Sequence, residues 1–381
     1  SRIINNLKKK MYIRKLPVYM LGACGHAGID WAHSLLDNHK QILIMPAFSF
    51  FRTLHKIETI NKINLKKLDD CNFAAKTISD MFYFDRGYTA KRRKIIFNEN
   101  QKIFFQTELC EYLKNSKENS IVKLFFGIHH AFCKIHNINL KDIKCIVAHE
   151  HVSWHFHKYF HYFNAKMLLI FRDPRASLGG GILKMGNVNK SKIINSFQLD
   201  SMILDMMSTY SIYSKMKNNN KMFFLKNEKM HAGLEGEMKR LAKWMSIDYR
   251  NSLLEQTFMG QVWLGESAYL TEERLQDPLP KNFYSLKEME KRWREVLSKN
   301  DIVLLEVIFR NMIKEFNYTF DNSLNFFQIL LNYLKFFFKY QHQEKYHINR
   351  YLIILRNIIR RASILMLKEK TVTIWNVFKF K

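Results

Sequence analysis

The chain has 381 residues, of which 47% are hydrophobic, and this is enough apolar material for one large α/β domain or two modest ones. Disorder is therefore not the expected state of the chain. Lysine and arginine total 61 against 34 aspartate and glutamate residues, which gives a formal net charge of +27. Such an excess indicates either an anionic partner or the codon bias of an AT-rich genome, so charge alone selects no function.

Cysteine usage and hydropathy bear on the compartment. The five cysteines are scattered, without a CxxC pair or the Cys/His spacing of a zinc site, and this is typical of a reduced compartment. We expect a cytoplasmic protein, with peripheral attachment to a membrane as an alternative. Lysine or arginine interrupts every long apolar run, which argues against a spanning helix. No signal peptide precedes the first predicted strand, but the sequence opens at Ser1, so removal of an upstream targeting segment stays open.

Five short apolar runs bounded by polar turns have the length of β-strands. They cover residues 17–21, 41–46, 143–148, 166–171 and 221–226. Longer stretches with helical spacing separate them, and residues 48–139 are expected to be mostly helical. This alternation predicts an α/β fold with a mostly parallel central sheet and helices on both faces.

The pattern beyond the fifth strand predicts further helices. Residues 235–248 carry apolar side chains at the spacing of one helix face, and residues 285–318 predict two helices with a break near Asn300. From residue 325 onward, aromatic and aliphatic residues are interleaved with lysine and arginine. We predict a basic amphipathic helical C-terminal appendage, residues 325–381, beside an α/β domain, residues 1–324.

Two interpretations of the appendage stay open. A basic amphipathic helix is typical of proteins that lie on an anionic membrane surface. Alternatively, the apolar face packs on the domain core or in a dimer, with the basic side chains in solvent. Nucleic acid is a less favoured partner, because the sequence holds no recognised nucleic-acid module.

Residues 18–36 predict a strand, a glycine-bearing turn and a helix, and the turn reads "GACGHAGID". Backbone N–H groups at a helix start favour an anion, and Gly22, Gly25 and Gly28 leave room for its close approach. The turn lacks the Gly-Lys-Ser/Thr ending of a Walker A loop, and it also fails the Rossmann fingerprint. A packing role for the glycines is the alternative to an anion site.

A second candidate feature is "MLLIFRDPRASLGGGI", residues 167–182, in which a buried strand runs into Arg172. An arginine at the C-terminal end of a sheet strand lies where doubly wound folds bind ligands, and its planar guanidinium suits a phosphate. The alternative is an Arg–Asp pair that only caps the strand.

These two segments resemble the PAPS-dependent sulfotransferases, in particular the bacterial and Golgi carbohydrate-type members of that P-loop-like fold. "GACGHAGIDWAHSLLDNHKQILIMP" is similar to the family's 5′-phosphosulfate loop with the helix and strand that follow, and "AKMLLIFRDPRAS" is similar to its 3′-phosphate-binding strand and loop. Weaker similarities follow in the expected order at "FFLKNEKM" and "TFMGQVWLGES". The resemblance spans residues 17–318.

The resemblance implies an enzyme that moves a sulfuryl group in line from PAPS to a hydroxyl or amine of a carbohydrate or lipid-linked acceptor, without a metal. Arg172 matches the family's phosphate-binding arginine, Gly180 stands where the family has a serine, and Ser177 is the substitute. The donor-binding residues that the resemblance implies are Gly25, Ala27, Gly28, Ile29, Asp30, Arg172, Ser177 and Gly180.

The loop departs from the family pattern. His26 stands at the position of the catalytic lysine or arginine, and Ala27, Ile29 and Asp30 stand where the family has hydroxyl residues. An imidazolium at His26 could still donate to the leaving phosphate, with the backbone amides of residues 25–29 holding the anion. Two alternatives therefore stay open: a degenerate protein of this fold that binds a glycan or partner without turnover, and an enzyme with another nucleotide donor.

A catalytic base is expected in "VAHEHVSWHFH", residues 147–157, after the third predicted strand. His151 matches the family's histidine and His149 stands in place of its lysine, and either His151 or Glu150 is the predicted general base. For each histidine, a helix start without catalytic duty is the alternative. His151 and His155 have the spacing of metal ligands on a helix face, but no acidic or cysteine partner accompanies them, and we predict no metal site.

Overall fold

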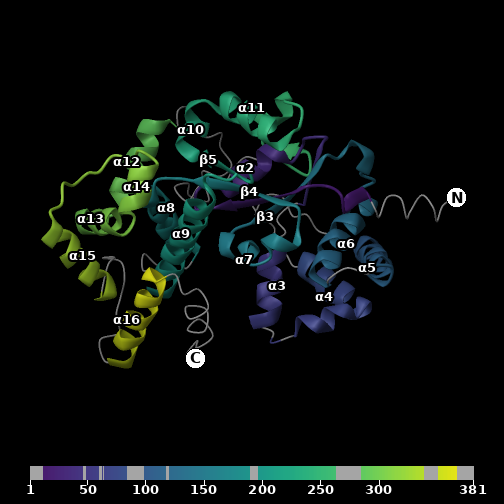
Figure 1. Ribbon diagram of the computed structural model, residues 1–381, viewed down its shortest axis with the longest axis horizontal. Helices are drawn as coiled ribbons and strands as arrows, with labels where there is room; N and C mark the ends of the chain where they lie inside the picture. The colour runs from purple at the N-terminus through teal and green to yellow at the C-terminus, as the bar shows by residue number, and fades with distance from the viewer. Residues whose placement is uncertain are drawn as a thin grey trace.

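The chain folds around a parallel β-sheet, shown in Figure 1. The computed structural model describes residues 12–45, 49–59, 62, 64–83, 98–116, 120–188, 196–262, 285–338 and 351–366. The sheet strands are β1 (Val18–Ala23), β2 (Ile42–Ile44), β3 (Cys145–Glu150), β4 (Ala165–Phe171) and β5 (Met222–Lys226). They lie in the order β2-β3-β1-β4-β5, and all neighbouring pairs are parallel. The five predicted strands and the α/β class are confirmed.

Helices cover both faces of the sheet (Figure 1). Their bounds are α2 (Ile29–Leu36), α3 (Phe50–Thr59), α4 (Cys71–Tyr83), α5 (Glu99–Lys114), α6 (Ser120–Ile135), α7 (Ser153–His157), α8 (Pro174–Val188), α9 (Ser196–Met216), α10 (Asn227–Ala232), α11 (Leu234–Met245), α12 (Leu286–Val296), α13 (Lys299–Ile308), α14 (Arg310–Glu315), α15 (Phe326–Phe338) and α16 (Tyr351–Leu365). Short 3₁₀ turns are η1 (Leu65–Asp69), η2 (Leu140–Asp142), η3 (Phe160–Tyr162) and η4 (Asn251–Leu254), and a small antiparallel pair is β6 (Thr257–Phe258) with β7 (Gln261–Val262). The helices described between residues 48 and 139 agree with the prediction.

The strands are buried on both faces, which is why they are continuous apolar runs rather than alternating ones. Alternate residues of β1 point to opposite faces: Met20 joins the core that contains Phe51 of α3, and Leu21 joins the core that contains Leu35 of α2. In Figure 1, α2, α10 and α11 lie above the sheet, and α3, α7 and α9 lie below it. Strand β1 therefore contributes side chains to the cores on both faces of the sheet and so connects the two helical layers.

The segment from residue 285 to 318 forms three helices, α12, α13 and α14, so the predicted break near Asn300 is confirmed, whereas the prediction of two helices is wrong because the second one ends at Ile308. The first break comes before Asn300, because Ser298 caps α13 in a reciprocal capping box with Asp301. Asn300 itself lies in the first turn of α13.

The C-terminal segment packs against the domain through its last described helix. Helix α16 contacts α9, and Arg360 and Arg361 are buried there. Their Nε atoms donate to the two oxygens of Asp200 on α9, at 2.6 and 2.9 Å. The helix therefore packs on the domain, as the core-packing alternative expects, but these two arginines bind an internal carboxylate instead of lying in solvent. The division into residues 1–324 and 325–381 stays a prediction.

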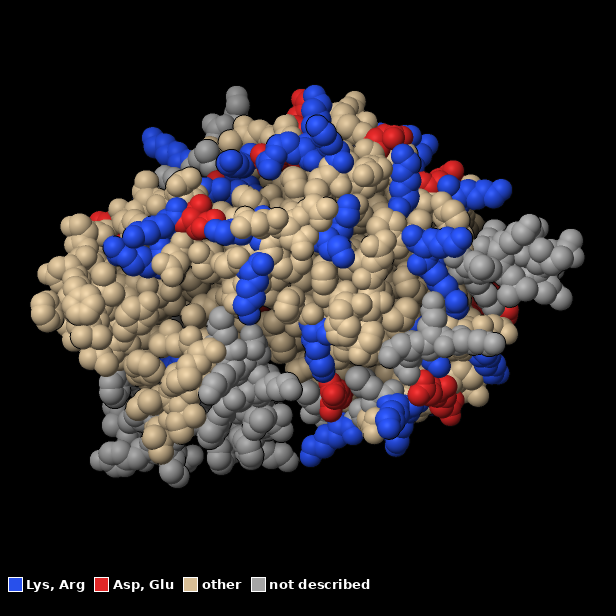
Figure 2. Space-filling view, viewed as in Figure 1, with Lys and Arg blue, Asp and Glu red and all other residues tan. Residues whose placement is uncertain are grey.

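Two surface properties bear on partners. Among the described residues, the helices are too short or too polar for any of them to cross a membrane. On the face seen in Figure 2, lysine and arginine side chains are spread among uncharged ones rather than gathered in a single patch. The excess of positive charge therefore does not outline an anion-binding surface on this face.

Candidate functional site

The candidate site lies where the strand connections change direction. Strands β1 and β4 are neighbours in the centre of the sheet. From β1 the chain continues to β2 at one edge of the sheet, and from β4 it continues to β5 at the opposite edge. Open α/β sheets bind ligands outside the carboxyl ends of two such strands. Both features singled out in the sequence lie here, because the turn of residues 24–28 follows β1 and Arg172 follows β4.

The turn after β1 has an unusual backbone. Gly25, His26 and Gly28 have φ angles of 31°, 44° and 94°, in the left-handed region that residues other than glycine rarely adopt. Holding a histidine there costs about 1–3 kcal/mol, and such strain is concentrated at ligand sites. Gly28 is the N-cap of α2 and supplies no side-chain hydrogen bond to the helix start. The turn thus presents helix N-terminal amides at the end of the sheet, as the anion interpretation requires.

A contact from the helix that follows β5 shapes this turn. The side-chain amide of Asn227, at the start of α10, donates to the carbonyl oxygen of Ala27 at 2.9 Å. A Cβ atom on Gly28 would lie 2.6 Å from the Asn227 Nδ2 atom. Two features therefore require glycine at position 28: its positive φ angle and the close approach of Asn227.

Arg172 connects the second feature to the turn. Its Nη1 atom donates to the carbonyl oxygen of His26 at 3.5 Å and also lies beside Gly180 of α8. The ring of His26 packs on Gly181, where an added Cβ would come within 2.8 Å of it. The structure therefore brings together His26, Arg172 and Gly180, which the sequence analysis assigned to one site, and adds Gly181.

Two side chains at this point carry buried hydrogen-bond donors. Among the described residues, neither the Nε atom of Arg172 nor the Oγ atom of Ser177 has a hydrogen-bond partner, although both atoms are shielded from solvent. Ser177 and Gly180 are three residues apart on α8 and so lie on the same side of the helix. Leaving buried donors unmatched costs free energy, and a bound anion would recover it.

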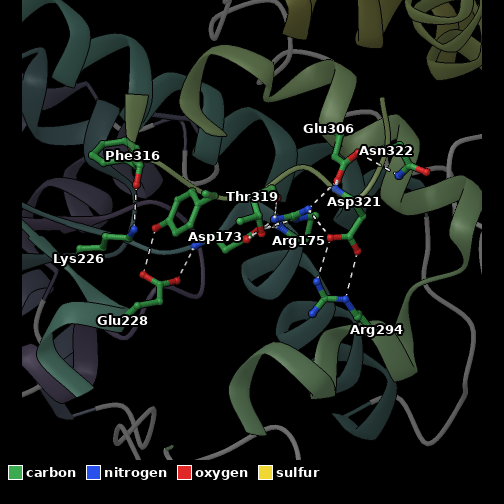
Figure 3. A network of polar contacts seen from close by, with 11 residues as sticks. Asp173, Arg175, Lys226, Glu228, Arg294, Glu306, Phe316, Thr319, Asp321 and Asn322 are labelled. Carbon is green, nitrogen blue, oxygen red and sulfur yellow. Dashed lines mark hydrogen bonds and ion pairs between the residues drawn. The ribbon is translucent and has the colours of Figure 1, made fainter. Parts of the chain in front are cut away.

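The neighbouring Arg175 has a different role, shown in Figure 3. Its buried guanidinium donates to Asp173 at 2.7 and 3.0 Å, to Glu306 at 2.6 Å and to the carbonyl oxygen of Thr319 at 2.7 Å. It also stacks over the ring of Trp293 at 4.7 Å. The Arg–Asp pair considered as an alternative for this segment is thus made by Arg175, and Arg172 remains directed at the turn.

Two half-buried carboxyl groups, Asp205 and Glu228, lie near the turn and Arg172. The Gly25 N–H donates to Asp205 of α9, and burial raises the pKa of Asp205 well above its ordinary value. Burial also raises the pKa of Glu228, which accepts hydrogen bonds from the Asp173 N–H at 2.9 Å and from the Tyr318 hydroxyl at 3.1 Å. A raised pKa favours the neutral carboxyl, which repels an anion less than a carboxylate does.

The two candidate bases lie in different surroundings. Glu150 is fully buried, accepts the Arg52 N–H at 2.9 Å, and has the ring of His155 3.8 Å away. His151 has a side chain that is 24% exposed and lies 3.9 Å from Asp30. The two candidate bases therefore differ in exposure, and of the two only His151 can be reached from solvent.

His149 and Asp30 join His151 in one cluster. The Nε2 atoms of His149 and His151 are 3.2 Å apart, and the Oδ1 atom of Asp30 is 3.7 Å from the former and 3.9 Å from the latter. On its other side, the Nδ1 atom of His149 is 2.9 Å from the Nδ1 atom of His33 on α2. Burial lowers the pKa of His149 to about 3.

Sequence reasoning missed three parts of this site. Asp205 belongs to no motif, and Asn227 lies in "FFLKNEKM" without a role predicted for it; both come from elements more than 170 positions beyond the turn, so only the fold reveals their contacts with it. The acidic partner of His149 and His151 is Asp30, which the sequence analysis placed in the donor loop alone. Gly22 and Glu150 are paired in register across β1 and β3, and this pairing brings the two loops together.

Comparisons with known proteins place sulfotransferase domains among similar solved structures. No protein-family model and no curated protein matches the chain. The sulfotransferase domain from the curacin biosynthetic pathway has a TM-score of 0.47 at 11% identity, with 80% of this chain and 99% of that chain covered. The sulfotransferase domain of the Synechococcus PCC 7002 olefin synthase has a TM-score of 0.44 at 11% identity, covering 80% and 95%. Sulfotransferase STF9 from Mycobacterium avium has a TM-score of 0.40 at 12% identity, covering 84% and 82%.

Proposed function

We propose that the edge between β1 and β4 binds the phosphates of PAPS and that the protein moves its sulfuryl group to an acceptor. The observation that carries the proposal is a pair of buried donors, Arg172 Nε and Ser177 Oγ, that have no hydrogen-bond partner in the described part of the chain, beside a left-handed glycine turn at a helix start. Arginine suits the planar, multiply charged oxygens of a phosphate. The sequence resemblance described above supports the same donor.

The chemistry needs alignment, charge stabilisation and proton removal. Helix-start amides of residues 25–29 would hold the phosphosulfate, and His26 would donate to the leaving phosphate. His151 is our proposed base rather than Glu150, because its ring is reachable while the Glu150 carboxyl is fully buried. The acceptor that we propose is a hydroxyl or amine of a carbohydrate or lipid-linked molecule, as the resemblance implies.

Calorimetry with adenosine 3′,5′-bisphosphate, the product nucleotide, tests donor binding. Arg172→Ala should weaken binding by about 10- to 150-fold, the value of a charge-assisted hydrogen bond. Arg240→Ala is the matched control, because this arginine lies on the outer side of α11, where it donates to Glu237 at 2.8 and 2.7 Å and lies over the ring of Phe223 at 5.2 Å. The proposal is overturned if adenosine 3′,5′-bisphosphate does not bind the wild-type protein and a thermal-shift series shows no preference for adenine over guanine and uridine nucleotides.

Catalytic transfer is a separate question from donor binding, because one observation favours a second function, that of a binding module without catalysis. The turn carries the acidic Asp30 and no lysine or arginine, which suits catalysis of sulfuryl transfer poorly and suits a glycan- or partner-binding module of the same fold. Incubation with labelled PAPS and a panel of glycans distinguishes the two. Sulfated product supports the enzyme, and nucleotide binding without any transfer supports the binding module.

A membrane surface is the partner that we propose for α15. Its exposed apolar residues recur at positions on one helix face and are Phe326, Phe327, Leu330, Leu331 and Leu334. In Figure 2, the left end of the molecule, where Figure 1 places α15, is mostly uncharged. Apolar side chains beside an exposed Lys335 suit the interface of an anionic bilayer.

Vesicle co-sedimentation tests this surface. Leu330→Glu should reduce binding to vesicles of mixed phosphatidylcholine and phosphatidylglycerol, because a carboxylate opposes both insertion and anionic headgroups. Ile103→Glu is the control, since Ile103 is a similarly exposed apolar residue on α5. Equal binding of both variants and the wild type would remove α15 from the proposal.

A further inference from the structure

Three ligand atoms of the types that transition metals bind converge beside the glycine turn. They are the Oδ1 atom of Asp30 in the first turn of α2, the Nε2 atom of His149 on β3, and the Nε2 atom of His151 just after β3. Their separations are 3.2, 3.7 and 3.9 Å. Three atoms with these separations have a common centre about 2.1 Å from each, which is the length of a zinc–nitrogen or zinc–oxygen bond.

We propose that Asp30, His149 and His151 bind a divalent transition-metal ion, for which Zn²⁺ is the probe. Two imidazoles and one carboxylate form a donor set that suits zinc and also ferrous iron. The ligands come from the end of β3 and from the helix that follows its neighbour β1, so the parallel sheet itself holds them in place. The site involves no cysteine, in agreement with the scattered cysteines of the sequence.

His33 positions the central ligand. It is fully buried, its Nδ1 atom is 2.9 Å from the Nδ1 atom of His149, and its ring stacks on Phe258 at 4.7 Å. A hydrogen bond at one ring nitrogen fixes the tautomer, so that the other nitrogen presents its lone pair to a metal.

The geometry leaves one side of the site open. The side chains of Asp30 and His151 are each 24% exposed, while that of His149 is 0% exposed. Three protein ligands and an accessible fourth position are typical of zinc sites that bind water or an anionic oxygen. An ion here would place positive charge beside a turn without lysine or arginine. This last consequence rests on the proposed function, whereas metal binding itself does not.

The test uses the full chain, freed of metal with EDTA and dialysed, and titrated with ZnCl₂ in a calorimeter without nucleotide. We expect one zinc ion per chain. His151→Gln and Asp30→Asn should each lower the affinity by at least about 10-fold, since even the loss of a supporting partner costs that much. The controls are His161→Gln and Asp142→Asn, which make the same chemical changes at exposed positions of η3 and η2.

A second readout separates ligation from folding. Co²⁺ added to the wild-type protein should give visible absorption bands of a low-coordinate site, and each ligand variant should reduce them. Thermal unfolding of the metal-free variants checks that they fold. No stoichiometric zinc binding, or equal affinity in folded His151→Gln and wild type, overturns the site.

The metal site and the proposed function fail independently. Adenosine bisphosphate titrated in the presence of EDTA reports the nucleotide site alone, and zinc titrated without nucleotide reports the metal site alone. A metal on His151 would occupy the side chain proposed above as the base. If zinc addition abolishes sulfuryl transfer, His151 is both the metal ligand and the general base. If transfer requires zinc, another group removes the proton from the acceptor.

Discussion

The side-chain amide of Asn227 donates a hydrogen bond to the carbonyl oxygen of Ala27 across 2.9 Å. This bond ties the turn after β1 to the end of β5, although β4 lies between the two strands in the sheet. Arg172 makes a second tie, from the end of β4 to the carbonyl oxygen of His26. The turn is thus fixed from two strands before any ligand arrives, and pre-organisation of this kind lowers the free-energy cost of binding.

Substitution of Gly28 should be costly. Gly28→Ala places a Cβ atom 2.6 Å from Asn227 Nδ2 at a φ of 94°, and we expect a loss of about 1–3 kcal/mol in the free energy of unfolding. Gly236→Ala is the control, because Gly236 lies within α11 with open space around its Cβ position. That variant should gain about 0.5–1 kcal/mol. Urea denaturation of both measures the difference, and equal midpoints would refute the argument.

Removal of the Ser177 hydroxyl should affect binding more than stability. Its Oγ atom is buried and has no partner among the described residues, so Ser177→Ala removes no protein hydrogen bond. We expect an unchanged unfolding midpoint and about 3- to 15-fold weaker binding of adenosine 3′,5′-bisphosphate. Ser363→Ala, a buried serine on α16, should leave both quantities unchanged. A marked loss of stability with unchanged binding would give Ser177 a structural role instead.

Neutralising Asp200 should destabilise the fold. The side chain is shared by Arg360 and Arg361, and Asp200→Asn leaves two buried guanidinium groups without their anionic partner. Breaking a buried ion pair costs about 3–5 kcal/mol. Glu315→Gln breaks the more exposed pair with Lys217 and should cost less than about 1 kcal/mol. Urea denaturation compares them, and protease cleavage within residues 351–366 should increase only in the Asp200 variant.

Stability should fall as the pH falls below neutrality. Burial lowers the pKa of His129 to about 4, and its Nδ1 atom lies 2.8 Å from the carbonyl oxygen of Phe125. Because the folded pKa is below the unfolded value of 6.5, the unfolded chain binds the proton first. The contribution of His129 is therefore present above pH 6.5 and is lost between pH 6.5 and 4.

The variant His129→Gln isolates this effect. The wild type should lose about 2 kcal/mol more than the variant between pH 7.5 and 5, as linkage requires for a pKa lowered to about 4. His161→Gln, at an exposed histidine, should keep the wild-type slope. Parallel slopes for wild type and His129→Gln would show that His129 takes up its proton in the folded state.

The sequence predicts the sheet well because parallel strands are buried on both faces and therefore appear as short apolar runs. It predicts the turn for a similar local reason, since glycines at left-handed positions are visible without a structure. Asn227, Asp205 and the meeting of Asp30 with His149 depend on strand order, which no local pattern encodes. Arg360 and Arg361 look like surface charges for the same reason, because their partner lies on α9.

The pairing of Asp200 with Arg360 and Arg361 also constrains the order of events during synthesis. The partners are separated by 160 and 161 positions, and a chain leaves the ribosome with its N-terminal part first. Helix α9 can therefore form early, but its carboxylate lacks both guanidinium groups until α16 has emerged. The α/β domain acquires its full stability only when translation has passed residue 361, so a nascent chain that stalls earlier exposes an unfinished core to chaperones and proteases.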